Sequence, residues 1–196
     1  SHSIVKALHA PTAAVVNPYE ACFGLITCAQ QNGTELFCGN PVLAISATAA
    51  GFAIKTAQHN FSCRIIINSA GVFADRVAAM VGAADFKLIF RKGEEYLLDR
   101  RLQGIVSRVI FPVPSATSKG VLIIPTVDGP IMVGPTATAV TDREDLSTSF
   151  TGASKVFATV RQYCPAISER DTITEFAGLR AVADSEDFII RPSPVK

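Results

Sequence analysis

The sequence contains no tryptophan, two methionines and only three histidines, and these shortages exclude several kinds of catalytic site. The five cysteines form no C-x-x-C pair and the histidines are scattered, so the ligand spacing of a zinc centre is missing. No G-x-S-x-G occurs, and no serine or cysteine stands in a pattern typical of nucleophilic catalysis. We therefore expect no metal and no catalytic nucleophile. We interpret the cysteines as buried, unreactive thiols of a reducing compartment.

Charge of one sign and long apolar runs are also missing. The net charge is +1 without any block of like charges, which argues against a nucleic-acid-binding surface. The mean hydropathy of +0.32 is high for a globular domain, yet no apolar run reaches the roughly 18 residues of a membrane helix. This apolar excess predicts extensive buried sheet or a surface that meets another domain. The cysteine usage and the lack of a visible signal peptide indicate a cytoplasmic location, with a peripheral membrane location as the alternative.

The sequence also lacks the glycine-rich loops that bind phosphate groups. Neither G-x-G-x-x-G nor G-x-x-x-x-G-K-[ST] occurs, so no complete dinucleotide site or P-loop is visible. What is present is "RIIINSAGVFADRVAAMVG", in which Asn68–Gly71 joins an apolar, strand-like run to a helical pattern. Small residues in such a turn let a ligand approach the backbone, and amides that enter the helix can meet a phosphate. The alternative is a packed turn without a ligand.

The patterning predicts an α+β fold, mainly antiparallel sheet with two or three packed helices. A helix is expected to begin at Pro18 after an Asn17 N-cap and to end near Gly33. The span 34–68 is typical of a β-meander whose last strand leads into the turn, and a helix follows over 72–81.

The second half is predicted to alternate strands with one helix. The strands are expected at 86–99, with a kink or bulge near Gly93, and at 105–112, 120–126 and 131–133, with a turn over 114–120. A helix beginning after Thr148 or Ser149 and ended by Pro165 precedes a final strand, turn and strand.

Two charged groups in strand patterns are candidate binding residues. Arg180 lies in "FAGLRAV" among small and apolar residues, and its guanidinium suits a carboxylate or a phosphate. Its partner is either a substrate or a nearby carboxylate of Glu175, Asp184, Glu186 or Asp187. In "RKGEEY", Arg91 or Lys92 could meet a phosphate and Tyr96 could offer its hydroxyl to a pocket; the alternative is a solvated sheet edge.

Five segments follow one another along the chain from about Lys6 to Pro194. They are "APTAAVVNPYE", "NSAG", "RKGEEYLLD", "VIFPVPS…KGVLIIPTVDGPIMVGPTA" and "FAGLRA…DFIIRPS". Together they resemble the FAD-dependent oxidoreductases of the D-amino-acid oxidase superfamily, of the glycerol-3-phosphate dehydrogenase and L-2-hydroxyglutarate oxidase type. The resemblance implies FAD as the cofactor. It also implies a substrate-binding sheet domain joined to part of an FAD-binding domain.

The resemblance also assigns regions and residues. Residues 4–82 would be a partial FAD-binding region with a helix and a β-meander, and 83–194 the substrate-binding domain; 1–3 are interpreted as a remnant of an expression tag. The site residues that it implies are Val42, Ser69, Ala70 and Gly71 for FAD, with Val42 at the adenine, and Arg180 and, more loosely, Tyr96 for the substrate.

The chain departs from the family pattern at both ends. The N-terminal G-x-G-x-x-G and the glycine-rich segment after the final strand are missing, so we interpret the chain as a fragment whose partners are the remaining FAD-domain segments and a small anionic substrate. The resemblance implies that the parent transfers a hydride from glycerol 3-phosphate or a 2-hydroxy acid to the flavin, and that the isolated chain is inactive. The alternatives are a non-catalytic anion-binding module that uses Arg180, or a structural domain.

Overall fold

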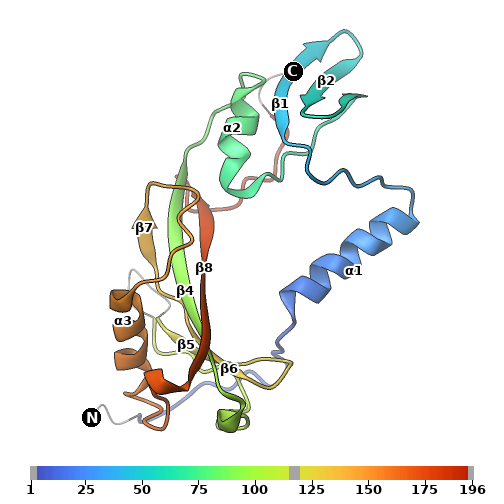
Figure 1. Ribbon diagram of the computed structural model, residues 1–196. Coiled ribbons are helices and arrows are strands. Elements are labelled where there is room, and N and C mark those ends of the chain that lie inside the picture. The colour runs from blue at the N-terminus through green and yellow to red at the C-terminus, as the bar shows by residue number, and fades with distance from the viewer. Residues whose placement is uncertain (1–3, 115–119, 194–196) are drawn as a thin grey trace. The chain divides into compact units, whose positions relative to one another are not determined.

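The computed structural model describes residues 4–114 and 120–193 (Figure 1). Most of the expected turn at 114–120, and the three residues at each end of the chain, lie outside the described residues. The chain divides into two compact units. Unit 1 comprises Ser1–Ala29, Lys92–Thr138 and Glu144–Gly178, and unit 2 comprises Gln30–Arg91, Ala139–Arg143 and Leu179–Lys196. The division of the chain into a cofactor region and a substrate region with a boundary after residue 82 stays a prediction.

The observed elements confirm a mixed fold of antiparallel sheet and helices. The helices are α1 (Pro18–Gln31), η1 (Gly71–Phe73), α2 (Ala74–Ala79), η2 (Arg100–Leu102), α3 (Phe150–Val160) and η3 (Glu169–Asp171). The strands are β1 (Val42–Thr48), β2 (Gly51–Thr56), β3 (Asn60–Cys63), β4 (Leu88–Leu98), β5 (Leu122–Pro125), β6 (Ile131–Gly134), β7 (Thr138–Val140) and β8 (Thr172–Ala183). One sheet has the order β1-β2-β3, and the other has the order β5-β6-β4-β7 with β8 also paired to β4.

The long helix α1 begins and ends where its sequence directs. The side-chain oxygen of Asn17 accepts hydrogen bonds from the amides of Tyr19 and Glu20, at 3.0 and 3.4 Å, which confirms the predicted N-cap. Gly33 follows the helix with a φ of 90°, a conformation that glycine adopts without strain. No residue of α1 is buried, although Tyr19 and Phe23 are large and apolar.

The β-meander of unit 2 is confirmed, but its expected last strand is shorter than predicted. β1, β2 and β3 pair antiparallel, and a Cβ at Gly51 would lie 2.2 Å from the carbonyl oxygen of Cys63, so only glycine fits there. The ladder ends at Cys63, and Ile65 and Ile67, which we predicted to continue the strand, are 76% and 86% exposed. A strand needs a hydrogen-bonded neighbour, and no described strand pairs with this run.

The core of unit 1 lies between α3 and its sheet (Figure 1). Gly152, Val156, Phe157 and Val160 recur at helical spacing and form the buried side of α3. The ring of Phe157 meets the ring of Tyr96 edge-on, with 5.5 Å between centroids. The Ser149 hydroxyl accepts a hydrogen bond from the Gly152 amide at 3.0 Å, so the helix begins where the sequence predicted.

Two expected strands are absent from the described structure. The run 105–112 forms only an isolated bridge between Ile110 and Ile123, because Pro112 and Pro114 lack the amide hydrogen that a continued ladder requires. After β8 the chain turns but makes no second strand, and Phe188 is 90% exposed. The short strand β7 was not predicted.

The expected surroundings of the cysteines also need correction. None of the five is buried: three are exposed, and Cys63 and Cys164 are intermediate. Cys22 and Cys28 are exposed because they belong to α1, which has no buried residue. Among the described residues no helix has the length and apolarity needed to cross a bilayer.

Candidate functional site

The turn at Asn68–Gly71 is braced by its own asparagine. The Asn68 amide nitrogen donates to the Ala74 carbonyl at 2.8 Å, and its oxygen accepts from the Ala70 amide at 3.3 Å. Gly71 has a φ of 56°, and a Cβ built there would meet no atom within 4 Å. The turn is therefore fixed from one side, while the space beside Gly71 stays open.

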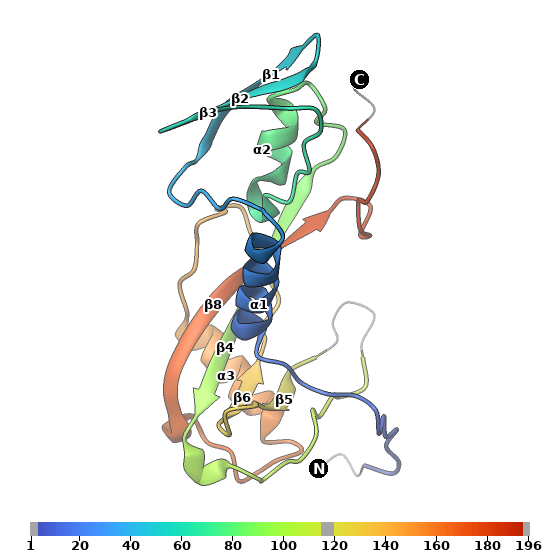
Figure 2. The same cartoon turned by 90° about the vertical axis from the view of Figure 1, so that its right-hand side faces the viewer.

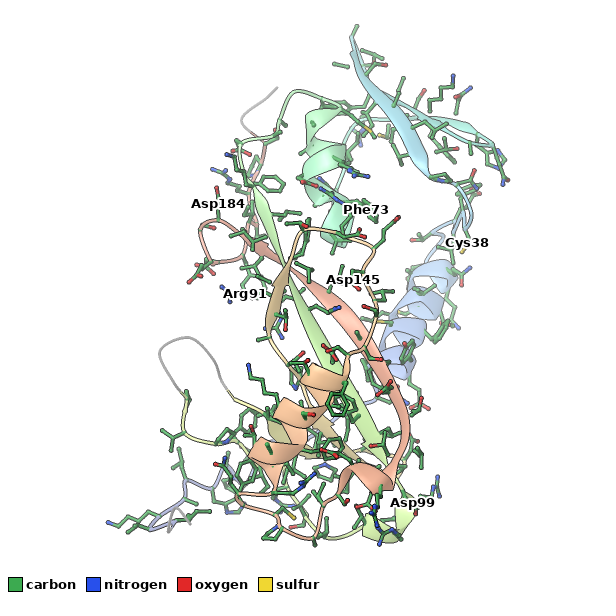
Figure 3. The ribbon with its side chains drawn as sticks, turned by 60° about the vertical axis from the view of Figure 1, so that its left-hand side comes forward. Cys38, Phe73, Arg91, Asp99, Asp145 and Asp184 are labelled. Atoms are coloured by element: carbon green, nitrogen blue, oxygen red, sulfur yellow. The ribbon has the colours of Figure 1, made fainter. Side chains whose placement is uncertain are left out.

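An arginine from a distant part of the sequence holds the element that follows this turn. The Arg143 guanidinium donates to the Val72 carbonyl at 2.9 Å and to both carboxylate oxygens of Asp75 at 2.9 and 3.3 Å. Its carbon lies 5.6 Å from the ring centre of Phe73, which is labelled beside α2 in Figure 3, and 4.9 Å from that of Phe90. The Arg143 side chain lowers the pKa of the Asp75 carboxyl. The start of α2 is thus fixed by charge and by stacking.

A pocket of about 1120 Å³ in unit 2 is lined by this turn. Its walls come from the β-meander, the run 65–71, helix α2, the end of β8 and the segment 187–193, and Figure 2 shows α2 beside the meander. Most of the lining is aliphatic, for example Ile45, Val77 and Val81. Helix α2 lies beside the β-meander in both Figure 1 and Figure 2. The pocket is slightly larger than most ligand sites, and it shares their largely apolar lining.

The lining fits the ring systems of FAD better than its phosphates. Flat, largely apolar rings could lie against the aliphatic wall, and Ser69 and Gly71 leave room for close approach of a ligand to the backbone. The single arginine in the lining, Arg191, forms an ion pair with Asp85. The described lining therefore offers surface and shape for FAD, and its one arginine is already neutralised.

The other residues predicted to bind cofactor or substrate lie elsewhere. Val42 is 37% exposed at the start of β1, next to an irregularity in the ladder, and does not line the pocket. Arg180 is exposed on β8, and its side chain makes no hydrogen bond or ion pair with a described residue. The structural ion pair considered from the sequence is therefore not seen there. Glu186 pairs with Arg91 and Glu175 accepts from Thr148 instead.

Tyr96 lies in the core of unit 1. Its side chain is 1% exposed, and its hydroxyl donates to the Glu94 carboxylate at 3.0 Å. Burial and this carboxylate raise the pKa of the Tyr96 hydroxyl. Glu94 also accepts from the Ser149 amide at 2.8 Å, so it joins β4 to the start of α3. The substrate contact expected for Tyr96 stays a prediction, and the geometry gives its hydroxyl a partner within the core.

The cations near Tyr96 are also engaged. Lys92 is 7% exposed and donates to Asp145 at 2.8 Å and to Ser147 at 3.1 Å, which with hydrogen bonds from Ser147 lowers the pKa of Asp145 to about 2. Arg91 pairs with Glu186 at 3.2 Å. Neither is a free phosphate ligand in this arrangement.

Glu95 is the residue that the sequence reasoning overlooked. Its Oε2 atom is buried and has no hydrogen-bond partner among the described residues. Desolvation raises the pKa of the Glu95 carboxyl to about 7. The signal was present, because alternation along β4 places Glu95 and Tyr96 on opposite faces, and only one of the two could face the α3 core.

The comparisons with known proteins agree on one family. The model of the family described as FAD dependent oxidoreductase matches residues 1–196. Over 190 residues the chain is 35% identical to a glycerol 3-phosphate dehydrogenase of Caloramator mitchellensis, a match that covers 97% of this chain and 40% of the relative. An L-2-hydroxyglutarate dehydrogenase of Salmonella houtenae is 27% identical over 214 residues, with 90% of this chain and 51% of the relative covered.

A solved structure matches the fold as well. It is the dithionite-reduced L-alpha-glycerophosphate oxidase from Mycoplasma pneumoniae with FAD bound, at a TM-score of 0.79 and 27% identity. The match covers 87% of this chain and 46% of that chain. The chain thus spans about half the length, or less, of the relatives that it matches. Because the family model matches residues 1–196, the chain belongs to the FAD dependent oxidoreductase family.

Proposed function

We propose that this chain is part of an FAD-dependent oxidoreductase that oxidises a small anionic hydroxy substrate, glycerol 3-phosphate or a 2-hydroxy acid. The observation that carries the proposal is the 1120 Å³ aliphatic pocket at the Asn68–Gly71 turn, the place where the sequence predicted FAD. The relatives named as glycerol 3-phosphate and L-2-hydroxyglutarate dehydrogenases support the substrate class. When bound, FAD would supply the redox chemistry by accepting a hydride from the substrate carbon.

The residues of this chain would bind and orient. Ser69 and Gly71, which line the pocket, would lie against FAD because the turn is open beside Gly71. Ala70, between them in the turn, and Val42, at the adenine, do not line the pocket and are proposed from the family resemblance alone. Arg180 would hold the substrate anion, since its guanidinium is exposed and has no ion-pair partner among the described residues. The substrate contact proposed for Tyr96 would require its hydroxyl to leave Glu94.

We also propose that the remaining FAD-domain segments of a longer parent chain cover the apolar wall of unit 2. Ile65 and Ile67 line the pocket and are 76% and 86% exposed. Exposed apolar residues grouped in this way mark a surface that normally meets another part of a protein. The relatives are about twice as long as the matched region, which supports the existence of such segments.

The test compares flavin binding in this chain and in its parent. Each protein is purified, mixed with FAD and desalted, and the visible absorbance is recorded. The parent, in the absence of oxygen, should keep flavin and lose its absorbance on addition of glycerol 3-phosphate or 2-hydroxyglutarate. R180A should abolish this bleaching at low substrate concentration. R161A is the matched control, because Arg161 forms an exposed ion pair with Glu169.

The outcomes separate the proposal from its alternatives. A parent that binds neither flavin nor an anion would favour the structural domain. A parent that lacks flavin but binds phosphate or a hydroxy acid through Arg180 would favour the anion-binding module. Flavin retained by this chain alone would mean that the pocket residues suffice for FAD.

A further inference from the structure

Glu95 lies on the face of the unit 1 sheet that α3 does not cover. Along β4 the even-numbered residues from Lys92 to Leu98 are buried, and Tyr96 meets α3 through Phe157. The odd-numbered residues therefore point to the opposite side. On β8, which pairs with β4, Glu175 faces the α3 side because it accepts from Thr148. We define the open face by the residues that alternation places opposite: Gly93, Glu95 and Leu97 of β4, and Thr174, Phe176 and Gly178 of β8.

Glycines lie beside Glu95 on the open face, and Pro135 borders it near Gly93. On the neighbouring strand β6, a Cβ at Gly134 would lie 3.1 Å from the Glu95 Oε2 atom and 2.8 Å from the Glu94 carbonyl oxygen. A Cβ at Gly93, which precedes Glu95 on the same face, would lie 3.0 Å from the Pro135 side chain, whereas a Cβ at Gly178 would meet nothing within 4 Å. Phe176 is 48% exposed. Ligand sites combine apolar surface with a few polar groups, and Glu95 has small or apolar neighbours at Gly93, Leu97 and Phe176 on this face.

The Glu95 carboxyl has no charged partner to explain its burial. Desolvation alone raises its pKa to about 7, and its Oε2 atom has no partner among the described residues. β6 offers no titratable group, and the one charged residue at an even-numbered position of β8 is Arg180, further along the strand than Gly178. On β4, Arg91 has the same parity as Glu95 but is taken up by Glu186. A buried carboxyl oxygen without a hydrogen-bond partner lowers the stability of the fold unless a ligand supplies that partner.

We propose that Glu95 contacts the substrate on the open face and donates a hydrogen bond, as a neutral carboxylic acid, to an oxygen of its anionic group. This inference rests on the proposed function. A neutral acid is an O–H donor, whereas its ionised form would repel the same anion. Substrate binding at alkaline pH should therefore be accompanied by the uptake of one proton by Glu95. Glu95 would favour anions with an oxygen that can accept a hydrogen bond from its O–H group.

The experiment uses the flavin-loaded parent protein and 2-hydroxyglutarate, whose carboxylates do not titrate between pH 6 and 9. In the wild type the Kd, measured by the change in flavin absorbance, should rise about tenfold per pH unit above pH 7, as expected for uptake of one proton. E95Q, a permanently neutral donor, should keep a Kd near the low-pH value across this range. E95L, which has no donor, should raise KM about 10- to 100-fold with kcat changed only a few-fold.

The control variant is E35Q, because Glu35 is exposed and makes no interaction with a described residue. It should follow the wild-type pH profile. Parallel profiles for wild type and E95Q, or an unchanged KM in E95L, would overturn the role of Glu95 while the proposed function stands. A wild-type parent that no hydroxy acid or glycerol 3-phosphate bleaches would overturn both. Thermal unfolding of each variant shows whether a change in KM has a structural origin.

Discussion

At the scale of single residues, Glu95 makes the stability of this chain depend on pH. Its carboxyl has a pKa of about 7 in the folded chain against an ordinary value of 4.5. Between these values the folded state binds more protons than the unfolded state, so the free energy of unfolding falls as pH rises. The full shift corresponds to about 3 kcal/mol, and because the side chain is only partly buried we expect roughly half of that.

We predict that E95Q removes the fall in the free energy of unfolding that Glu95 causes as pH rises. Its free energy of unfolding should equal that of the wild type near pH 4 and exceed it by roughly 1–2 kcal/mol at pH 8. Urea denaturation at several pH values measures the difference. E35Q should follow the wild type throughout, and an E95Q curve that also follows it would show that Glu95 is not strained by burial.

The Arg143 side chain is a second residue with a large expected effect. R143K loses the two-pronged contact with Asp75 and the planar stacking on Phe73 and Phe90. Because the pair is partly buried, we expect a loss of about 1–2 kcal/mol, above the fraction of a kcal/mol expected for exposed pairs. Hydrogen exchange of the α2 amides should speed up. R161K, in an exposed pair, is the control and should leave these amides unchanged.

The pH dependence of this ion pair has the opposite sign to that of Glu95. Arg143 lowers the pKa of Asp75 in the folded chain, so the stabilisation is complete above the ordinary value of 3.8. It is lost as pH falls through the lower folded value, because the unfolded state then binds more protons. R143K and wild type should therefore approach each other in α2 amide protection under strongly acidic conditions.

At the scale of secondary-structure elements, the glycines inside helices α1 and α3 respond differently to substitution by alanine. Glycine to alanine inside a helix usually stabilises by about 1 kcal/mol. In α1, a Cβ at Gly24 would meet nothing within 4 Å. In α3, a Cβ at Gly152 would lie 2.2 Å from the Glu94 carboxylate oxygen that caps the helix start. The same substitution should therefore help one helix and damage the other.

We predict that G24A increases the helical circular-dichroism signal and does not lower the melting temperature. G152A should lower the free energy of unfolding by about 1–3 kcal/mol, since Glu94 must move and lose its contacts with Ser149. An equal, favourable effect of both substitutions would contradict the role given to Glu94.

The helices were easier to predict from the sequence than the strands because their signals are local. Asn17 and Ser149 cap α1 and α3 through contacts within a few residues of themselves. The run 64–67 looked like a strand by composition, but a strand also requires a neighbour that composition does not reveal. The contacts of Arg143 with Val72 and Asp75 join segments some 70 residues apart, so no local pattern could indicate them.

At the scale of the whole molecule, one wall of the unit 2 pocket was predicted from the sequence. The turn at Asn68–Gly71 was found from the sequence because small residues and a helical pattern mark it locally. The other walls of its pocket come from the meander and from 187–193, which the fold brings to it from distant positions. The segment 187–193 was predicted as strand, and its place in the pocket lining was not anticipated.

The proposed longer parent makes one substitution informative about the molecule as a whole. Ile67 is 86% exposed in this chain, so I67N should change its melting temperature little. If further FAD-domain segments cover this wall in the parent, the same substitution places an unpartnered amide in a core. It should then cost about 3 kcal/mol or more and lower the flavin content.

The control is V127N, because Val127 is 53% exposed between β5 and β6 in unit 1, away from the pocket lining. It should have a small effect in both proteins. A large loss in the parent confined to I67N would identify the wall around Ile65–Ile67 as an internal interface of the complete enzyme. Equal, small effects of I67N in both proteins would mean that this wall faces solvent in the parent too, and the pocket would then hold FAD without a covering layer on that side.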